Sequence, residues 1–347
     1  MLKHYIKYAI RNFKSNRLVF AGSIATVFLG ALCISLLFTY IHNELSMNKL
    51  HKREKDIYLL TVQQSPESQV EAVEAELFFK FNYKDYPGIE NFATVKKYKK
   101  GEIVFTNNET KLSAEGIVAD STFFEIFDFK MKAGNKNTVL HDPNAILLTE
   151  DFAKKLFENE SPVGKAVKIT ERVEKVYTVK GIVESPPSNS SMVFDFIIPN
   201  HSEQFNRSGG NFILVNYNFN RAEFVAQIKD IGHKHEQFKD SRMDVMPLDD
   251  IYFNGAGVDF NGIFSKFGNR KSINILFAII GVVFIITLLN FSNLQIISIN
   301  SSLKNIGINK ISGAGKKHIF YQKITELFFL ITVSAVLITL AFTLVLP

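Results

Sequence analysis

Three stretches of the chain carry no charged side chain, and a long polar stretch separates the first from the other two. They run over Leu18–Ile41, Ser272–Leu303 (with its apolar part at Ile273–Phe291) and Leu327–Leu346. A helix rises about 1.5 Å per residue, so each stretch is long enough to cross the roughly 30 Å of bilayer hydrocarbon. The pattern predicts transmembrane helices over 18–41, 273–297 and 327–346, connected by 42–272 and 298–326.

A removable signal peptide is the alternative for the first stretch. Its apolar region is longer than the usual range of about 7–15 residues, and no A-x-A-like cleavage site follows, so a retained span is favoured. Buried helices of a soluble core are the alternative for the other two, but uninterrupted apolar runs of this length are rare in soluble proteins.

Basic residues set the expected orientation. Residues 1–17 carry basic side chains and no acidic one, and 298–326 carries five lysines and the single acid Glu326. The excess of Lys and Arg on short segments beside membrane helices predicts that both segments are cytoplasmic and that 42–272 lies outside. The net charge of +6 is thus a sign of topology, and without a nucleic-acid-binding motif it gives no reason to expect nucleic acid as a partner.

The first 17 residues form an amphipathic pattern. Leu2, Ile6 and Phe13 fall on one helical face, and Lys3 and Lys7 on another. We expect 1–17 to be a helix on the inner leaflet that leads into the first span, with an unstructured basic flank as the alternative.

The stretch 42–272 alternates helical and strand-like patterns, which predicts an α+β domain. Pro66 favours a helix carrying Val70, Val73, Leu77 and Phe81 on one side. Further predicted elements are a strand at Asn144–Leu148, a helix capped by Thr149, a strand at Val176–Val183 and a helix after Asn220 that buries Phe224, Val225, Ile228 and Ile231.

Composition and motifs give no sign of catalysis. The single cysteine, Cys33, excludes an intramolecular disulfide framework and a multi-cysteine metal site. There is no phosphate-cradling loop, because Gly164-Lys165 is followed by Ala166, and there is neither an H-E-x-x-H nor a G-x-S-x-G motif. We therefore expect no catalytic residues, no metal site and no cofactor bound by this chain.

Small residues repeat along the first span. Gly22, Thr26 and Gly30 lie four apart, a spacing that allows close approach of a neighbouring helix, although small residues are common in membrane helices in any case.

The inner segment 298–326 is the most informative part of the chain. It places Leu303, Ile306 and Ile311 on one side of a short helix, which a glycine-rich break then ends. Isoleucines in a cytoplasmic segment need burial, and a short helix inserted in a partner's groove provides it; a helix lying on the inner leaflet is the alternative.

In their order along the chain, these segments resemble the FtsX-like, or MacB-like, family of ABC-transporter permeases, especially the Bacteroidetes type. Similar motifs are Tyr8–Phe13, Asn43–Ser46, Leu50–Tyr58, Phe123–Phe127, Ala153–Phe157, Pro162–Lys165, Phe194–Phe196 and Thr325-Glu326. In the inner segment, Lys304, Ile306, Gly307, Ile308, Lys310, Gly313 and Ala314 match the family's coupling motif, whereas Asn305 and Asn309 replace its Glu and Arg.

The resemblance implies three spans around a MacB-type periplasmic core domain at 42–272, in a multi-pass protein of the cell inner membrane. It implies that ATP binds to a separate ABC ATPase subunit, that a second permease subunit or a second half of the same chain completes the complex, and that membrane lipid and a periplasmic adaptor are further partners. The family's fourth span is missing before Pro347, so we expect an N-terminal half or a truncated member.

The implied function is mechanotransmission, in which ATP hydrolysis changes the shape of the outer domain. Family members export antimicrobial peptides or antibiotics, release lipoproteins or activate cell-wall hydrolases. Two other classes stay open: a membrane-anchored sensor or scaffold that binds peptide without transport, and a membrane-anchored enzyme with its site in 42–272.

Overall fold

The computed structural model divides the chain into two compact units, Met1–Asn43 with Arg270–Pro347, and Glu44–Asn269. The residues it describes are 11–73, 82–107, 110–158, 160–170, 174–200, 209–233, 241–311 and 313–345. Each unit has its own architecture, and the two are described separately.

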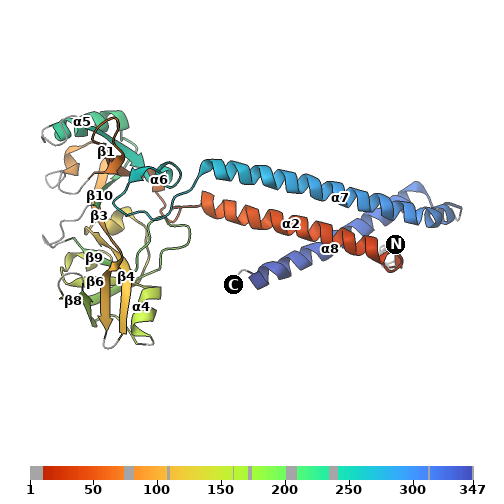
Figure 1. Ribbon diagram of the computed structural model, residues 1–347, viewed down its shortest axis with the longest axis horizontal. Coiled ribbons are helices and arrows are strands. Elements are labelled where there is room, and N and C mark those ends of the chain that lie inside the picture. The colour runs from red at the N-terminus through yellow and green to blue at the C-terminus, as the bar shows by residue number, and fades with distance from the viewer. Residues whose placement is uncertain are drawn as a thin grey trace. The chain divides into compact units, whose positions relative to one another are not determined.

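The first unit holds three long helices, α2 (Arg17–Leu45), α7 (Arg270–Ile311) and α8 (Lys316–Val345) (Figure 1). Each is long and apolar enough to cross a membrane. In the most apolar 18-residue stretch of each helix, the share that is buried within the chain is only 11% for α2, 6% for α7 and 17% for α8. Most of these apolar side chains therefore point outward, as they do in helices that face lipid or further helices.

The helices extend beyond the predicted spans. Residues 11–15 are also helical, and the rest of the predicted amphipathic segment, residues 1–10, lies outside the described residues. The segment 298–326 is mostly helix: its first part continues α7 and its last part opens α8. The short separate helix expected there is thus the end of a 42-residue helix.

The second unit is a mixed α+β domain built on one twelve-stranded sheet, and the predicted fold class is confirmed. Its strands are β1 (Ile57–Gln63), β2 (Val70–Ala72), β3 (Ile89–Asn107), β4 (Thr110–Ala119), β5 (Met131–Ala133), β6 (Ala145–Thr149), β7 (Ala166–Thr170), β8 (Glu174–Val183), β9 (Phe196–Pro199), β10 (Gly209–Val215), β11 (Arg242–Pro247) and β12 (Val258–Asp259). Its helices are α3 (Phe123–Ile126), α4 (Glu150–Phe157), α5 (Arg221–His233) and α6 (Leu248–Asn254), with short 3-10 turns η1 (Glu54–Asp56), η3 (Tyr83–Asp85) and η4 (Val139–His141).

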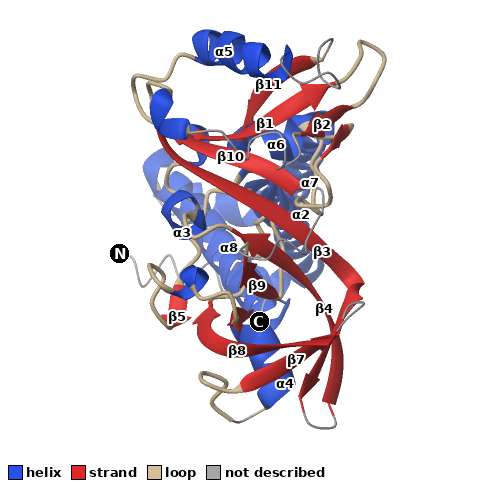
Figure 2. Ribbon diagram, turned by 90° about the vertical axis from the view of Figure 1, so that its left-hand side faces the viewer, coloured by secondary structure: helices blue, strands red, loops and turns tan. Residues whose placement is uncertain are grey.

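The 19-residue strand β3 joins the two halves of this sheet (Figure 2). The strand order is β12-β2-β1-β10-β3-β4-β9-β6-β8-β5, with β11 paired to β1, and β7 paired to β3 and β8. The first part of β3 pairs with β10, and after a register shift between Tyr98 and Ile103 its second part pairs with β4 and β7. Gly101 lies in this irregularity with φ +97°, a conformation that side-chain-bearing residues rarely adopt.

Three hydrophobic clusters fill the unit. One contains Leu59, Ile117, Phe123 and Phe212, a second packs α4 against β6 and β8, and a third lies between α5 and strands β1 and β11. The phenylalanines of the family-like motifs at 123–127 and 194–196 are all core residues, because Phe123, Phe124, Phe127, Phe194 and Phe196 are buried.

The start of α4 is as predicted. The Thr149 hydroxyl accepts a hydrogen bond from the Phe152 N–H at 3.4 Å, and Glu150 and Asp151 occupy the first turn, where the helix dipole favours acids. Strand β8 and helix α5 also lie where they were expected.

The helix predicted after Pro66 is wrong over its described residues. Ser65–Ser68 is a turn closed by a bond from the Ser68 N–H to the Ser65 carbonyl, and Val70–Ala72 is strand β2. Thr61↔Ala72 and Val70↔Val258 pair this strand on its two sides. The spacing of Val70 and Val73 fits a helix, but pairing with β1, just before it in the sequence, and with β12, far along the sequence, outweighs that local preference. Leu77 and Phe81 lie outside the described residues.

Candidate coupling site at the α7–α8 turn

Helix α7 ends in a Schellman motif. The Gly313 N–H bonds to the Lys310 carbonyl at 3.1 Å, and the Ala314 N–H bonds to the Asn309 carbonyl at 2.9 Å. Gly313 takes φ +89°, the left-handed conformation that this helix end requires. The glycine-rich sequence therefore makes a defined turn, after which the His318 N–H bonds to the Gly315 carbonyl and α8 begins.

The predicted coupling residues divide between this turn and the last turns of α7. Lys304, Ile306, Gly307, Ile308 and Lys310 lie on the helix, while Gly313 and Ala314 form the turn. A side chain built at Gly307 would meet nothing within 4 Å. Its surroundings in this chain are thus open, and nothing in the described structure requires a glycine there.

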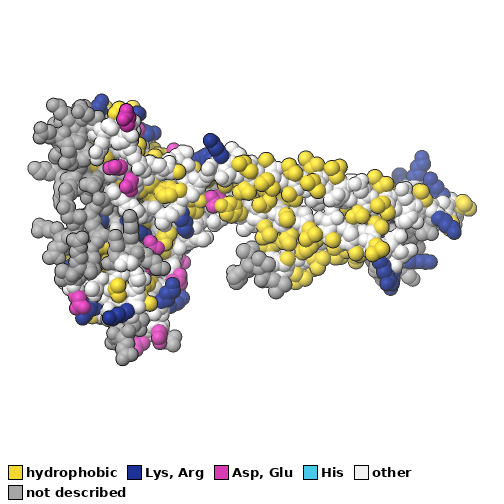
Figure 3. Space-filling model, in the orientation of Figure 1, with side chains coloured by type: hydrophobic (Ala, Val, Ile, Leu, Met, Phe, Trp, Pro, Cys, Tyr) yellow, Lys and Arg dark blue, Asp and Glu magenta, His cyan; other side chains and the backbone are white. Residues whose placement is uncertain are grey.

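Apolar side chains around the turn are exposed. Ile311 is 90% exposed and Ile308 53% exposed, and across the turn Phe320 and Tyr321 are also exposed. Ile306 is half-buried. Lys and Arg side chains gather at the same end of the helical unit (Figure 3). This combination of apolar and basic groups is typical of a surface that another molecule covers.

The predicted small-residue ridge lies partly in a helix contact. A side chain at Gly30 would come within 2.2 Å of Thr287 Oγ1 on α7, and one at Gly22 would lie 3.6 Å from Leu294 Cδ1. Thr26 between them is half-buried. Gly30 is therefore the residue that lets α2 and α7 approach.

Sequence reasoning missed a buried polar cluster in the same unit. Asn12 Nδ2 donates to Glu326 Oε1 at 3.0 Å, and Lys323 Nζ lies 2.7 Å from Glu326 Oε2. The match of Thr325-Glu326 to a family motif is the available signal; the sequence pattern ends the segment 298–326 at Glu326, whereas in the structure Glu326 lies within α8.

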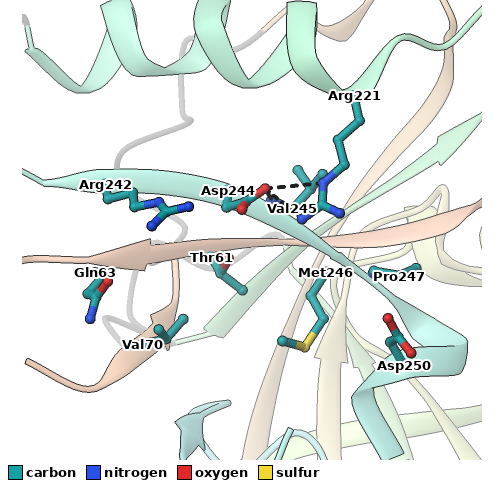
Figure 4. A pocket seen from close by; sticks show the side chains of 10 residues that line it. All are labelled: Thr61, Gln63, Val70, Arg221, Arg242, Asp244, Val245, Met246, Pro247 and Asp250. Atoms are coloured by element: carbon teal, nitrogen blue, oxygen red, sulfur yellow. Dashed lines mark hydrogen bonds and ion pairs between the residues drawn. The ribbon is translucent and has the colours of Figure 1, made fainter. Parts of the chain in front are cut away.

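The second unit, Glu44–Asn269, holds a cavity of about 240 Å³ between β1, β11 and α6. Arg221 reaches from α5 to Asp244 on β11, with Nη2 2.9 Å from the carboxylate, and Arg242, Asp250 and Gln63 line the same cavity (Figure 4). The positive charges of Arg221 and Arg242 are thus matched by the negative charges of Asp244 and Asp250. The cavity therefore favours neither an anionic nor a cationic ligand.

Lys97 and His51 are buried ionisable groups of the second unit, Glu44–Asn269. Lys97 on β3, its side chain 2% exposed, donates to the Val193 carbonyl and lies 3.2 Å from Glu115 on β4. Burial lowers the pKa of Lys97, opposed by Glu115, and burial raises the pKa of Asp195, which accepts the Glu115 N–H. The ion pair between Lys97 and Glu115 thus links strand β3 to its neighbour β4.

His51 is the second buried group. Its Nδ1 accepts the Asp128 N–H at 3.0 Å, and the rings of Phe127 and Phe129 pack edge-on against it. Burial lowers its pKa from 6.5 to about 4 despite the nearby Asp128 carboxylate. The side chain accepts a hydrogen bond in the core. Across the described part of the chain, no group of three or more His, Cys, Asp and Glu is placed to hold a metal ion.

Three solved structures are similar to part of this chain. They are the domain of a permease protein from Porphyromonas gingivalis (16% identity, 56% of this chain and 91% of that chain, TM-score 0.45), the periplasmic region of MacB from Actinobacillus actinomycetemcomitans (14%, 57% and 91%, 0.42) and the extracellular domain of the noncanonic ABC-type transporter YknZ from Gram-positive bacteria (16%, 55% and 99%, 0.39). No curated protein matches this chain.

The family model is the decisive comparison, because it matches one continuous part of the chain. The model of the MacB-like periplasmic core domain covers residues 20–231, from the first long helix into α5. This is more than half of the chain, and the protein therefore belongs to the MacB-like family as an ABC-transporter-type permease with a MacB-like periplasmic domain.

Proposed function

We propose that this chain is the membrane subunit of a mechanotransmitting ABC transporter, coupling ATP hydrolysis by a separate ATPase subunit to a change in its outer domain. The observation that carries the proposal is the α7–α8 turn, where the exposed Ile308 and Ile311 stand beside Lys304 and Lys310 at the end of two long helices. In this proposal the capped turn passes a displacement along both helices, since long helices without proline curve gently and do not kink sharply.

In this proposal the turn is cytoplasmic and fits a groove of the ATPase, as amphipathic helices fit apolar grooves of their partners. Residues 42–272 are then periplasmic in a protein of the inner membrane, since the basic segments stay inside. The chain itself is not an enzyme and binds no cofactor; ATP binds to the partner.

The apolar faces of the helices fit the remaining partners. Their spans are largely unburied within this chain, so lipid, a second permease subunit or a second half of the same chain covers them. An adaptor in the periplasm and a substrate of the antimicrobial-peptide, antibiotic or lipoprotein type, with a role in antibiotic resistance, complete the proposal.

The test is a tagged purification of the full chain from native membranes in mild detergent, with mass spectrometry and an ATP-hydrolysis assay on the same sample. Gly307→Leu is the informative variant, because nothing in this chain lies within 4 Å of the new side chain. Gly281→Leu is its control on the same helix, also without a neighbour within 4 Å.

We expect an ATPase to co-purify with the wild type and with Gly281→Leu, and its co-purification or stimulation to fall at least about tenfold with Gly307→Leu, the effect of losing about 1.4 kcal/mol of binding. Co-purification and stimulation that are equal in both variants would remove the turn as the coupling site. A wild-type chain that binds a peptide but brings no ATPase would favour the sensor or scaffold function instead.

A further inference from the structure

A carboxylate is buried among the apolar helices of the first unit. Glu326 on α8 is 6% exposed. It lies within the helical segment Lys316–Thr343, which is long and apolar enough to cross a membrane. Acidic side chains are almost never buried to this degree without partners. Both carboxylate oxygens of Glu326 have one, Oε1 with Asn12 and Oε2 with Lys323.

The Asn12 contact joins two segments that are 314 residues apart in the sequence. Asn12 is itself 8% exposed, and its Oδ1 accepts a hydrogen bond from Asn16 Nδ2 at 3.2 Å. Asn16, Asn12, Glu326 and Lys323 therefore form one chain of polar contacts. It ties the residues that precede α2 to the first three turns of α8.

Aromatic rings from the same segments pack against one another. Phe13 stacks on Phe20 with ring centroids 3.8 Å apart, and Phe329 lies 5.3 Å from Phe13 and 6.5 Å from Phe20. The two segments thus pack through apolar rings as well as through the polar pair. In low-dielectric surroundings a hydrogen bond to a charge is stronger than at a surface, and leaving the charge unpaired is costly.

Helix α7 joins the cluster from a third side. Gln295 Nε2 lies 3.4 Å from Ser23 Oγ of α2, and both residues line a cavity with Ser298 and Glu326. The cavity measures about 20 Å³, room for about one water molecule. It is too small for a transported substrate, so the cluster serves to hold the helices and not to conduct a solute.

We propose that Glu326 is a positioning residue. Through Asn12 it fixes residues 11–16, which lead into α2, to α8, so that α2 moves with the α7–α8 turn. The carboxylate lies about 15 Å along α8 from Lys316, where the helix leaves the turn. A displacement of the turn reaches Glu326 first and is passed through Asn12 to α2. The positioning role rests on the proposed coupling function. The contact by which Glu326 holds Asn12 does not depend on that function.

The experiment uses three variants of the full chain. Asn12→Asp places a second carboxylate against Glu326; Glu326→Gln keeps an oxygen that accepts from Asn12; and Asn12→Asp with Glu326→Gln exchanges donor and acceptor and restores the hydrogen bond. Limited trypsin digestion after Lys14, followed by mass spectrometry, reports whether the segment is held. Cleavage of a transiently released segment follows the population of the released form.

We expect Asn12→Asp to raise the rate of cleavage after Lys14 about tenfold, and the double variant to return it to within about twofold of the wild type, since tenfold corresponds to about 1.4 kcal/mol. Glu326→Gln alone should stay close to the wild type. Equal cleavage in wild type and Asn12→Asp would overturn the holding contact.

The coupling role has a separate readout. In the complex with the ATPase, Asn12→Asp should lower the stimulated kcat without lowering the amount of ATPase that co-purifies, and the double variant should restore kcat. A kcat that is unchanged in Asn12→Asp, while cleavage rises, would overturn the positioning role alone. If the wild type brings no ATPase, the proposed function fails, and the cleavage rates still decide whether Glu326 holds the segment.

Discussion

Gly30 on α2 faces Thr287 on α7 at a distance that leaves no room for a methyl group, since a Cβ at Gly30 would lie 2.2 Å from Thr287 Oγ1 and 2.6 Å from its Cγ2. Thr287 cannot easily turn away, because its hydroxyl donates to the Val283 carbonyl at 2.7 Å. The two helices thus meet at a point where one side must be a glycine.

Gly30→Ala should therefore separate α2 from α7, whereas Gly22→Ala should not. At Gly22 the new methyl group would lie 3.6 Å from Leu294 Cδ1, an ordinary van der Waals contact. We expect Gly30→Ala to lower the stability of the helical unit by about 1–3 kcal/mol, the usual cost of overpacking. Thermal unfolding of the full chain in detergent measures it, and a Gly22→Ala variant that unfolds as early as Gly30→Ala would contradict this explanation.

The Schellman motif predicts a second difference between two neighbouring glycines. Gly313 has φ +89°, whereas Gly315 has no left-handed φ, and both face open space. Gly313→Ala should strain the turn by about 1–2 kcal/mol and free the last turn of α7, while Gly315→Ala should leave it intact. Hydrogen exchange of the amides at 306–311 should accelerate about tenfold in the first variant only. Protection unaffected by Gly313→Ala would show that the cap does not stabilise the turn.

The buried His51 predicts that the outer domain loses stability in mild acid. Its pKa is about 4 in the folded chain and 6.5 when exposed, so between these values the unfolded chain binds more protons. The stability that the folded domain gains from keeping His51 uncharged is fully present above pH 6.5, decreases as the pH falls, and is lost near pH 4. The difference corresponds to about 3 kcal/mol, or roughly 6–12 °C in Tm for a domain of this size.

His51→Asn is the matched variant for this prediction, because its amide oxygen can accept the Asp128 N–H and does not titrate. The change in Tm between pH 7 and pH 4 should be smaller in His51→Asn than in the wild type by about that amount. Parallel pH profiles in the two proteins would assign the acid sensitivity to other groups.

Local patterns in the sequence were sufficient where structure depends on neighbours along the chain. Thr149 with Glu150 and Asp151 specifies the start of α4, and the glycines after Lys310 specify the end of α7. The uncharged runs specify the long helices, because their length and apolar character exceed what a soluble core needs.

Contacts between distant segments were beyond local patterns. Val70–Ala72 is a strand that β1, just before it in the sequence, pairs on one side and β12, far along the sequence, pairs on the other, and the residues 70–72 alone do not indicate the distant partner. The contact between Asn12 and Glu326 and the burial of Lys97 depend likewise on the complete packing.

The ion pair between Lys97 and Glu115 predicts an asymmetry between removing one charge and removing both. The Lys97 side chain is 2% exposed and that of Glu115 27% exposed, and their charged groups lie 3.2 Å apart. Glu115→Ala leaves the lysine buried without its main counter-charge, which should cost about 3 kcal/mol or more, because an uncompensated buried charge is strongly destabilising. Adding Lys97→Met removes that charge and keeps a similar volume, so the double variant should recover most of the lost stability. The check is thermal unfolding of both variants beside the wild type; a double variant no more stable than Glu115→Ala alone would mean that strand packing, and not the charge, makes Glu115 important.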